Sequence, residues 1–312
     1  MAFEASIQPG TGDQLIILKD KNNGTAAEIF AFGALLNAFR VQAGETTHDL
    51  VDGFGSPADA REHILNGFKS AKLSPFVCRL RKGGYRYDGQ DFTIEKYFMG
   101  EHAIHGLLFD AVYRISEWGS DSEKAFATLE YDYDGHDKGY PFPYRIRIHW
   151  QLEKNNRLTV STTVSHNNAG PIPYTDGWHP YFTLGGSVDD WTLQFNSHQQ
   201  LEYDADLLPT GNQLRDDRFE KGVLLKGIEL DNSFELTEAT PVCVLSNQQW
   251  KLCIHPDKSY PILQIYIPPQ RKSIAIENLS GAPDNFNNHI HLLTIAPGEE
   301  RTFTTSYTVS AL

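Results

Sequence analysis

Apolar and polar residues alternate along several stretches of the chain, and this period of two predicts β-strands. The alternation is clearest at 129–133, 146–152 and 158–164, and it returns in the closing stretch 303–309. Lys154-Asn155-Asn156 separates two of these stretches and is typical of a hairpin loop. These four stretches therefore predict long strands, two of them joined by a hairpin.

The N-terminal part of the chain is harder to assign. Residues 15–18 form an apolar run that predicts a strand. Residues 28–41 permit a helix by their alanine and leucine content, but we interpret them as strands because Gly33 and the recurring phenylalanines interrupt a helical pattern.

One stretch carries the signals of a helix start. Ser56 can cap a helix, Pro57 suits its first position, and Asp59 and Glu62 fall near the positive end of the helix dipole. Gly67 predicts an early stop, so we expect this helix to be short.

Strands bounded by turn residues, with few short helices and no alternation of strand and helix, predict an all-β fold of packed antiparallel sheets. The sequence has no linker, low-complexity tract or internal repeat. We therefore predict one domain over residues 1–312, and its 40% hydrophobic content is enough for a large core.

The net charge of the chain limits the kinds of partner that it can bind. Lysine and arginine number 27 against 40 acidic residues, which gives a formal net charge of −13. An acidic surface repels phosphate backbones and anionic lipids, so we expect neither a nucleic acid nor a membrane as a partner. The same charge argues against a phosphorylated substrate, unless a local basic pocket overrides it.

The three cysteines have no paired spacing, which does not indicate a disulfide framework. The first residues lack a basic stretch followed by an apolar run, and no window approaches eighteen apolar residues. We expect a cytoplasmic protein without a signal peptide, either a monomer or a weak dimer.

The stretch 177–182 places the imidazole of His179 among large aromatic rings, between a glycine and a proline. Such rings exclude water and offer flat faces on which a sugar ring can stack. A histidine there has a shifted pKa and a restrained rotamer, as a proton-transfer catalyst near neutral pH requires. The alternative is a buried histidine that hydrogen-bonds to the backbone of a turn.

Glu277 is the second candidate. It follows the alternation of Ile274 and Ile276 and so ends a stretch that reads as a buried strand, just before a loop at 278–281. A carboxylate at a strand end can face a cleft, and the alternative is a solvated strand terminus.

Two histidine pairs have spacings that suit a metal ion. His102 and His105 would share a face only on a helix, and the region does not look helical, whereas His289 and His291 would share a strand face. No cysteine or carboxylate cluster completes either pair, so we predict no metal site.

Asp132, Asp134 and Asp137, around Gly135, resemble a fragment of a calcium loop. The glutamate expected at the twelfth position is missing, so we interpret the segment as a solvated acidic turn. The sequence also lacks the glycine-rich motifs of nucleotide sites and the nucleophile elbow of hydrolases.

Seven short segments follow one another along the chain: Cys78-Arg79-Leu80, His105-Gly106, 134–141, 178–184, 230–234, 264–266, and Glu277 followed by 283–287. Their residue types and their order resemble the aldose 1-epimerase (galactose mutarotase) family. The family carries an Asn-Arg-Ile-like segment, then His-Gly, Asp-Gly-x-x-Gly-Tyr-Pro, Asn-His-Pro-Tyr-Phe-x-Leu, Leu-Asp-x-x-Phe, Gln-x-Tyr, and a Glu before Pro-Asp-x-x-Asn. The resemblance covers the chain from about Gly33 to its end.

The resemblance implies an antiparallel β-supersandwich with a sugar cleft, and an isomerase that interconverts the α and β anomers of a free aldose without a metal or redox cofactor. It implies His179 as the general acid and Glu277 as the general base. The implied substrate-binding residues are Arg79, His105, Asp231 and Gln264. We further expect Trp178, Tyr181 and Phe182 to form an aromatic wall of the cleft, and Asp231 to raise the pKa of His179, so that His179 stays protonated while Glu277 stays ionised.

The chain departs from the family pattern at three places: Cys78 and Trp178 each replace an asparagine, and 107–109 replaces a second glycine and its neighbours. These changes do not affect the predicted acid and base, but they leave the identity of the sugar undetermined. One alternative is a hexose-6-phosphate epimerase of the same fold, which would need cations from Arg79, Arg81 and Lys82 or from Arg271 and Lys272. The other is a carbohydrate-binding protein without catalysis.

Overall fold

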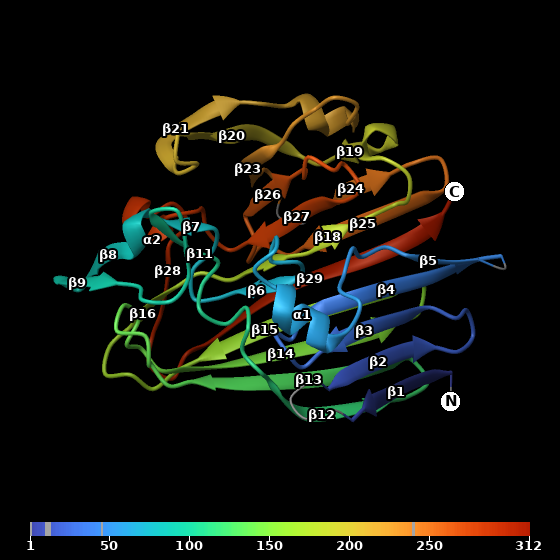
Figure 1. Ribbon diagram of the computed structural model, residues 1–312, viewed down its shortest axis with the longest axis horizontal. Coiled ribbons are helices and arrows are strands. Elements are labelled where there is room, and N and C mark those ends of the chain that lie inside the picture. The colour runs from blue at the N-terminus through green and yellow to red at the C-terminus, as the bar shows by residue number, and fades with distance from the viewer. Residues whose placement is uncertain (1, 10–13, 45, 239–240) are drawn as a thin grey trace.

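The computed structural model describes residues 2–9, 14–44, 46–238 and 241–312. Extended strands dominate it, and strands that are far apart in the sequence lie side by side (Figure 1). Wherever two of the strands named below are paired, the pairing is antiparallel. The predicted all-β class with antiparallel sheets is thus confirmed; that the whole chain forms one domain stays a prediction.

The longest sheet joins the middle of the chain to its C-terminal strand. Its strands are, in spatial order, β12 (Arg114–Ser120), β13 (Lys124–Tyr133), β14 (Tyr144–Glu153), β15 (Arg157–Ser165), β29 (Glu300–Ala311), β25 (Trp250–Pro256), β24 (Cys243–Ser246), β19 (Thr192–Gln194) and β22 (Val223–Leu224). The predicted hairpin at 154–156 joins β14 to β15, and β29 buries the predicted face of Phe303, Thr305, Tyr307 and Val309. The period of two therefore identified these strands correctly.

A second sheet carries the candidate site. Its strands are, in spatial order, β21 (Pro209–Arg215), β20 (Ser197–Tyr203), β23 (Asp231–Leu236), β26 (Ile262–Tyr266), β27 (Ile274–Leu279), β17 (Gly177–His179) and β6 (Ala71–Leu73), and the short β18 (Tyr181–Phe182) also pairs with β27. In the view of Figure 1, its strands β20, β23, β26 and β27 lie to the left of β19, β24 and β25 of the longest sheet.

The N-terminal sheet runs in chain order through β1 (Phe3–Gln8), β2 (Leu15–Asp20), β3 (Ala26–Phe30), β4 (Leu36–Ala43) and β5 (Thr46–Asp49), and it contacts β12, β13 and β14. Residues 28–41 are thus strands joined by a turn, as predicted. The smaller pairings are β10 (Phe98–Met99) with β11 (His102–Ile104) and β7 (Arg79–Leu80), β8 (Gly84–Tyr87) with β9 (Gln90–Thr93), and β16 (Ile172–Tyr174) with β28 (Leu293–Ile295).

The predicted helix is α1 (Pro57–His63), and Ser56 caps it by accepting a hydrogen bond at Oγ from the backbone N–H of Asp59 at 3.1 Å. It is short, as expected, but it ends several residues before Gly67. The other helical segments are α2 (Asn285–Asn288) and the 3₁₀ turns η1 (Arg81–Gly83), η2 (Val188–Asp190) and η3 (Arg218–Lys221).

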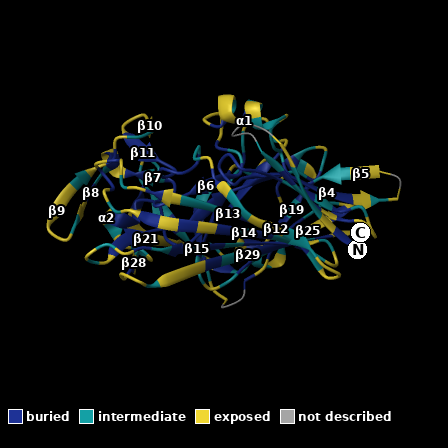
Figure 2. Cartoon of the chain, turned by 90° about the horizontal axis from the view of Figure 1, so that it is seen from below, coloured by how far each residue is buried: buried dark blue, intermediate teal, exposed yellow. Residues whose placement is uncertain are grey.

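Buried side chains fill the space between the sheets, and the burial colouring of Figure 2 shows the interior of the long strands in dark blue. Trp150, Phe39 and Ile276 come from three different sheets and belong to one continuous apolar core. Each such side chain contributes roughly 1.5–3 kcal/mol through removal of apolar surface from water. In the part of the chain that is described, no helix is long and apolar enough to cross a membrane.

Candidate active site

Four neighbouring strands each contribute a polar side chain to one row of the second sheet. Ser233 on β23 is registered with Gln264 on β26, and Gln264 is registered with Glu277 on β27. Gly177 on β17 pairs with Leu279, and extending this antiparallel register by two residues sets His179 opposite Glu277. Because side chains at paired positions point to the same face of a sheet, the row Ser233–Gln264–Glu277–His179 faces one side.

Three members of this row, Gln264, Glu277 and His179, line a cavity of about 210 Å³. The walls come from loops and from the small β7–β11 pairing. The lining side chains include Phe68, Cys78, Arg79, Met99, His105, Tyr181, Tyr203, Leu207, Asp231 and Tyr266. All but one of the residues predicted for the site, namely His179, Glu277, Arg79, His105, Asp231 and Gln264, thus line one cavity.

His179 and Glu277 are in direct contact inside this cavity. The distance from His179 Nε2 to Glu277 Oε1 is 3.3 Å, and the two residues are only 5% and 2% exposed. Cys78 Sγ lies 3.9 Å from the other carboxylate oxygen, Oε2. Glu277 lies within β27, which continues to Leu279, and this corrects the prediction that it ends its strand.

Burial disfavours the charged form of both partners. It raises the pKa of Glu277 well above its usual value, and the nearby charge of Asp231 raises that pKa further. Burial lowers the pKa of His179 to about 4. The expectation that Asp231 raises the pKa of His179 is therefore wrong, because loss of hydration dominates.

When the pair carries one proton, that proton can be transferred between the two groups. A neutral imidazole beside a protonated carboxyl and an imidazolium beside a carboxylate contain the same number of protons. The two states differ only in whether the proton sits on Oε1 or on Nε2, which lie 3.3 Å apart. The site can therefore supply an acid and a base without exchanging a proton with solvent.

His105 forms the wall next to His179. Its ring meets the ring of His179 edge to face, with centroids 4.9 Å apart, and it also packs against Phe68. Burial, with a smaller contribution from the charge of His179, holds the pKa of His105 well below its usual value. A neutral imidazole at this position can donate or accept a hydrogen bond toward a bound hydroxyl.

The backbone of this wall is strained. His105 has a φ of 61° and Cys78 a φ of 48°, and the His105 N–H donates to the Cys78 carbonyl oxygen at 2.9 Å. Left-handed conformations of residues other than glycine and asparagine are costly and concentrate at functional sites. The strain therefore supports a functional role for the segment that positions Cys78, Arg79 and His105.

Gly106 next to His105 gives a stability prediction. Its φ is +76°, and a Cβ there would lie 2.2 Å from the backbone oxygen of Ser74. We expect Gly106→Ala to lower the free energy of unfolding by about 3 kcal/mol, from the left-handed φ together with the clash. Urea denaturation measures the loss. The control is Gly100→Ala, at φ +63° with no atom within 4 Å of the added methyl; an equal loss in both variants would show that the close approach to Ser74 is unimportant.

A chain of hydrogen bonds fixes the amide of Gln264. Its Nε2 donates to Asp231 Oδ1 at 2.8 Å, and its Oε1 accepts from the hydroxyls of Ser233 at 2.5 Å and Tyr203 at 3.1 Å. The second carboxylate oxygen of Asp231, Oδ2, takes no part in these hydrogen bonds. Sequence reasoning missed Ser233 and Tyr203, because only the pairing of β20, β23 and β26 brings them beside Gln264.

Trp178 is the one predicted site residue that does not line the cavity. It is buried in the core, where its ring packs against Trp150 with centroids 5.5 Å apart and under Lys72 Nζ at 4.4 Å. Phe182 is likewise in the core, against Tyr307. The reason is the period of two in a strand: His179 and Tyr181 point to the cavity, so Trp178 and Phe182 point away.

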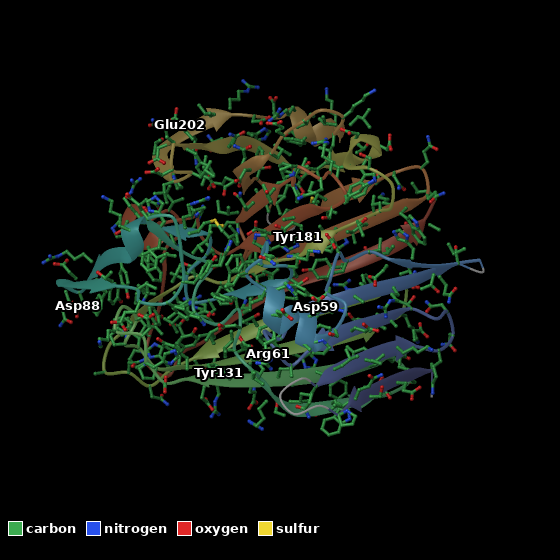
Figure 3. The ribbon with its side chains drawn as sticks, viewed as in Figure 1. Asp59, Arg61, Asp88, Tyr131, Tyr181 and Glu202 are labelled. Atoms are coloured by element: carbon green, nitrogen blue, oxygen red, sulfur yellow. The ribbon has the colours of Figure 1, made fainter. Side chains whose placement is uncertain are left out.

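Tyr181 is therefore the aromatic residue of this stretch that faces the cavity. In the view of Figure 3 it lies near the centre of the molecule, between the orange strands and the helix that carries Asp59. Its ring lies 5.1 Å from that of His179, at an angle of 30°. The aromatic wall predicted from the sequence is thus made by Tyr181, together with Phe68, Tyr203 and Tyr266.

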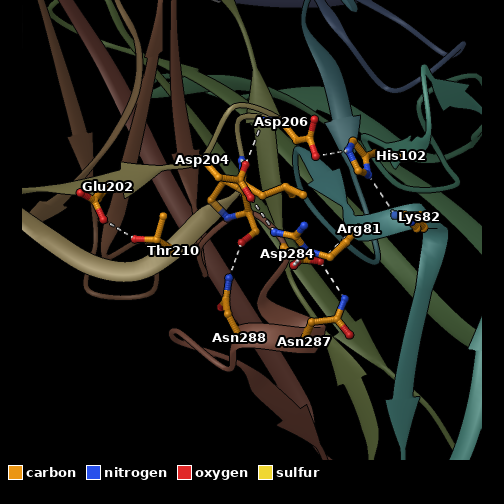
Figure 4. A network of polar contacts seen from close by, with 12 residues as sticks. Arg81, Lys82, His102, Glu202, Asp204, Asp206, Thr210, Asp284, Asn287 and Asn288 are labelled. Carbon is orange, nitrogen blue, oxygen red and sulfur yellow. Dashed lines mark hydrogen bonds and ion pairs between the residues drawn. The ribbon is translucent and has the colours of Figure 1, made fainter.

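Polar contacts at the rim hold the loop 204–208 over the cavity (Figure 4). Arg81 pairs with Asp204 at 2.8 Å, and Asp206 lies 3.7 Å from the imidazole of His102. The same loop contributes Leu207 to the cavity lining. His102 thus belongs to the rim while His105 belongs to the cavity, so the two histidines do not act as a pair.

Asp132, Asp134 and Asp137, the carboxylates that resemble a calcium loop, make separate contacts. Asp132 pairs with Arg145, and Asp134 contacts His136. Asp137 is buried and accepts backbone hydrogen bonds, including one from Gly139. Asp132 and Asp134 are exposed, as expected of a solvated acidic turn, and only the buried Asp137 corrects that interpretation. Within the described residues, no group of three or more potential ligands is arranged to hold a metal ion.

Comparisons with known proteins agree with this geometry. The sequence model of the aldose 1-epimerase family matches residues 14–308, which is nearly the whole chain. The chain belongs to the aldose 1-epimerase family.

Relatives in this family are distant in sequence. The uncharacterized protein YihR of Escherichia coli K12 is 29% identical over 248 residues, which cover 73% of this chain and 74% of that protein. The aldose 1-epimerase of Streptococcus thermophilus is 26% identical over 239 residues, and the match spans 72% of this chain and 66% of that enzyme.

Solved structures confirm the fold expected of an aldose 1-epimerase family member. Galactose 1-epimerase from Lactobacillus acidophilus superposes with a TM-score of 0.84 at 20% identity, covering 99% of this chain and 98% of that one. A galactose mutarotase-like protein from Clostridium acetobutylicum gives a TM-score of 0.85 at 14% identity, with 100% and 99% covered. The predicted galactose mutarotase-like β-sandwich is thus confirmed.

Proposed function

We propose that this member of the aldose 1-epimerase family interconverts the α and β anomers of a free aldose by general acid–base catalysis. The observation that carries the proposal is the buried contact between His179 Nε2 and Glu277 Oε1 at 3.3 Å, on the floor of a cavity lined with hydroxyl-binding side chains. The substrate hydroxyls would be held by Arg79, His105, Asp231 and Gln264.

The reaction follows from the shared proton. With the proton on His179, the Glu277 carboxylate takes the proton of the anomeric hydroxyl while Nε2–H protonates the ring oxygen. The bond between C1 and the ring oxygen breaks and leaves an open-chain aldehyde. Rotation about C1–C2 presents the other face of the carbonyl, and the reverse proton transfers close the ring as the second anomer.

Burial affects the two protonation states of the His179–Glu277 pair differently. After ring opening, Glu277 carries a proton and His179 is neutral, and burial favours the uncharged form of both groups. The charged state that starts ring opening is the less favoured one, and the two states are related by a single proton transfer. Because the two states contain the same number of protons, the same two groups can return to the starting state when the reaction runs in reverse.

The structure gives less support to a sugar phosphate as the substrate. Arg81 is paired with Asp204, and Arg271 pairs with Asp189 at 2.8 Å and donates to the carbonyl oxygens of Leu225 and Ile228. These guanidinium groups are already engaged, whereas a phosphate site requires several cations aimed at one point. Among the residues that the structure describes, Arg79 is the one arginine in the cavity lining.

Polarimetry tests the proposal directly. Crystalline α-glucose, α-galactose and other aldoses are dissolved, and the approach of the optical rotation to equilibrium is followed with and without the protein. We expect faster equilibration of at least one aldose, and the sugar with the largest kcat/KM identifies the substrate class. Sugar binding without acceleration would instead support a binding protein, and acceleration only of sugar phosphates would support the phosphate alternative.

The pH dependence gives a further prediction. Below the lowered pKa of His179, about 4, both groups are protonated and no carboxylate base remains. Above the raised pKa of Glu277, both are deprotonated and His179 has no proton to give. We expect a bell-shaped profile of kcat/KM with an acid limb near pH 4 and an alkaline limb well above the usual range of a glutamate. A single limb would contradict a mechanism that needs both groups.

A further inference from the structure

The carboxylate of Glu277 is contacted at both of its oxygens, from different parts of the chain. Oε1 lies 3.3 Å from Nε2 of His179, on the neighbouring strand β17. Oε2 lies 3.9 Å from the sulfur of Cys78, a distance at which a thiol S–H group can donate a weak hydrogen bond. Among the residues that the structure describes, Cys78 is the one donor to Oε2.

Contact at both oxygens matters because the terminal torsion of a glutamate side chain is broad, so a carboxylate that is held at one oxygen can still rotate. Cys78 and Glu277 are both buried. A buried carboxylate oxygen without a donor is costly, and the thiol reduces this cost at Oε2. The sulfur of Cys78 is therefore placed to fix the rotation of the Glu277 carboxylate and with it the position of Oε1.

The backbone around Cys78 is itself held in place by hydrogen bonds. The His105 N–H donates to the Cys78 carbonyl oxygen at 2.9 Å, and the Thr175 N–H donates to the carbonyl oxygen of Pro75 at 2.7 Å. The second bond ties this segment to the residues just before β17, the strand that carries His179. The left-handed φ of 48° at Cys78 is thus maintained by its surroundings, and these contacts set the sulfur position without a bound sugar.

The charges around Glu277 give the contact with Cys78 a specific effect. Burial raises the pKa of Glu277, the charge of Asp231 raises it further, and the hydrogen bond from Cys78 opposes both. Tyr181 and Tyr203 also face the carboxylate, and burial raises the pKa of both hydroxyls, so that they stay protonated. The thiol contact therefore favours the charged form of Glu277, which is the form that a general base requires.

We propose that Cys78 is a positioning residue for Glu277: its S–H group donates to Oε2 and so holds Oε1 next to His179, ready to take the proton of the anomeric hydroxyl. Burial raises the pKa of the Cys78 thiol well above its usual value, so the thiol keeps its proton and remains a donor. This inference rests on the proposed mutarotase function, because that function makes Glu277 the base.

The first test removes the donor. In Cys78→Ala, polarimetry with an aldose that the wild type equilibrates should show kcat lowered by about fivefold, as expected from the loss of one hydrogen bond, with KM within about twofold. The alkaline limb of the pH profile should move to higher pH, since loss of a hydrogen bond to the carboxylate raises the pKa of Glu277. An unchanged kcat, or a change in KM alone, would overturn the inference.

The second test restores a donor. Asparagine, the residue that the family pattern has at this position, tolerates a left-handed φ and offers an amide N–H to Oε2. Cys78→Asn should therefore recover kcat to within about twofold of the wild type. The matched control is Cys253→Ala, the same change at a cysteine outside the cavity lining, which should leave kcat and the alkaline limb unchanged. A Cys78→Asn variant as slow as Cys78→Ala would overturn the inference, because a donor would then be present without effect.

Infrared spectroscopy of the S–H stretching band tests the contact without turnover. The difference spectrum between the wild type and Cys78→Ala isolates the Cys78 band from those of Cys243 and Cys253. Glu277→Leu removes the acceptor with an apolar side chain of similar size. The Cys78 band, measured against Cys78→Ala/Glu277→Leu, should then move to higher wavenumber, as for a thiol that loses its acceptor.

The two kinds of measurement separate this inference from the proposed function. A Cys78 band that does not move in Glu277→Leu would overturn the inference, even if the protein equilibrates an aldose. If no aldose equilibrates faster, the mutarotase proposal falls, and the band alone decides whether Cys78 orients the Glu277 carboxylate.

Discussion

Glu277→Gln should lower kcat for the preferred aldose by about 10³-fold, since general acid–base catalysis contributes roughly 10²–10⁴-fold. Glutamine has the same shape as glutamate, but its amide cannot take the proton from the anomeric hydroxyl. Because the side chain is only 2% exposed and one of its oxygens faces His179, the neutral amide fits without a change in packing. Any rate that remains above the spontaneous mutarotation recorded without protein is then the catalysis left to His179 and to substrate binding.

The control for this variant is Glu229→Gln, which makes the same chemical change at an exposed position. It should leave kcat within about twofold, as expected of a surface substitution away from the site. Circular dichroism and the thermal midpoint show whether Glu277→Gln is folded, and we expect a midpoint no lower than that of the wild type because an ionisable group no longer has to be buried. A folded Glu277→Gln variant that keeps kcat within tenfold of the wild type would eliminate Glu277 as the base.

The local pattern of the sequence was enough to predict the long strands and α1. In β14, β15 and β29 one face is buried and the other is not, so the hydrophobic period appears directly in the sequence. The cap at Ser56 and the proline after it are also local signals. The order of strands in the sheets is not local: β29 pairs with β15 and β25, and no pattern within those strands specifies these partners.

In the candidate site, too, some features could be predicted from local sequence and others depend on the fold. The order of short segments along the chain was enough to select His179 and Glu277 as candidates, and the structure brings them together across β17 and β27. Their catalytic roles stay a prediction. The error at Trp178 came from treating an aromatic-rich stretch as one surface, although neighbours in a strand face opposite ways. The direction of the pKa shift at His179 was also predicted incorrectly, because loss of hydration depends on burial that only the folded chain shows.

Lys72→Ala should lower the free energy of unfolding by about 3–5 kcal/mol, the cost of leaving one member of a buried ion pair without its partner. Lys72 and Asp176 are completely buried behind the site, and Lys72 Nζ lies 2.5 Å from Asp176 Oδ2. Burial lowers the pKa of Lys72 to about 8, and the charge of Asp176 opposes this shift. Urea denaturation with two-state analysis measures the loss.

The expected loss of stability comes mainly from leaving the Asp176 carboxylate buried without a cation. The lost attraction within the pair contributes less. Asp176 also accepts hydrogen bonds from the hydroxyls of Tyr260 at 2.7 Å and Tyr174 at 3.0 Å, and these contacts remain in Lys72→Ala. The variant Lys72→Met/Asp176→Asn removes both charges, fills most of the lysine volume and keeps an oxygen that can accept from the tyrosines.

We therefore expect the double variant to be less destabilised than Lys72→Ala, although it contains more substitutions. The comparison also bears on the site, because Lys72 lies on β6, which pairs with the strand that carries His179. If the pair serves stability alone, the double variant should keep kcat near that of the wild type. A double variant as unstable as Lys72→Ala would show that the ion pair itself, and not the burial of a lone carboxylate, stabilises the strands behind His179.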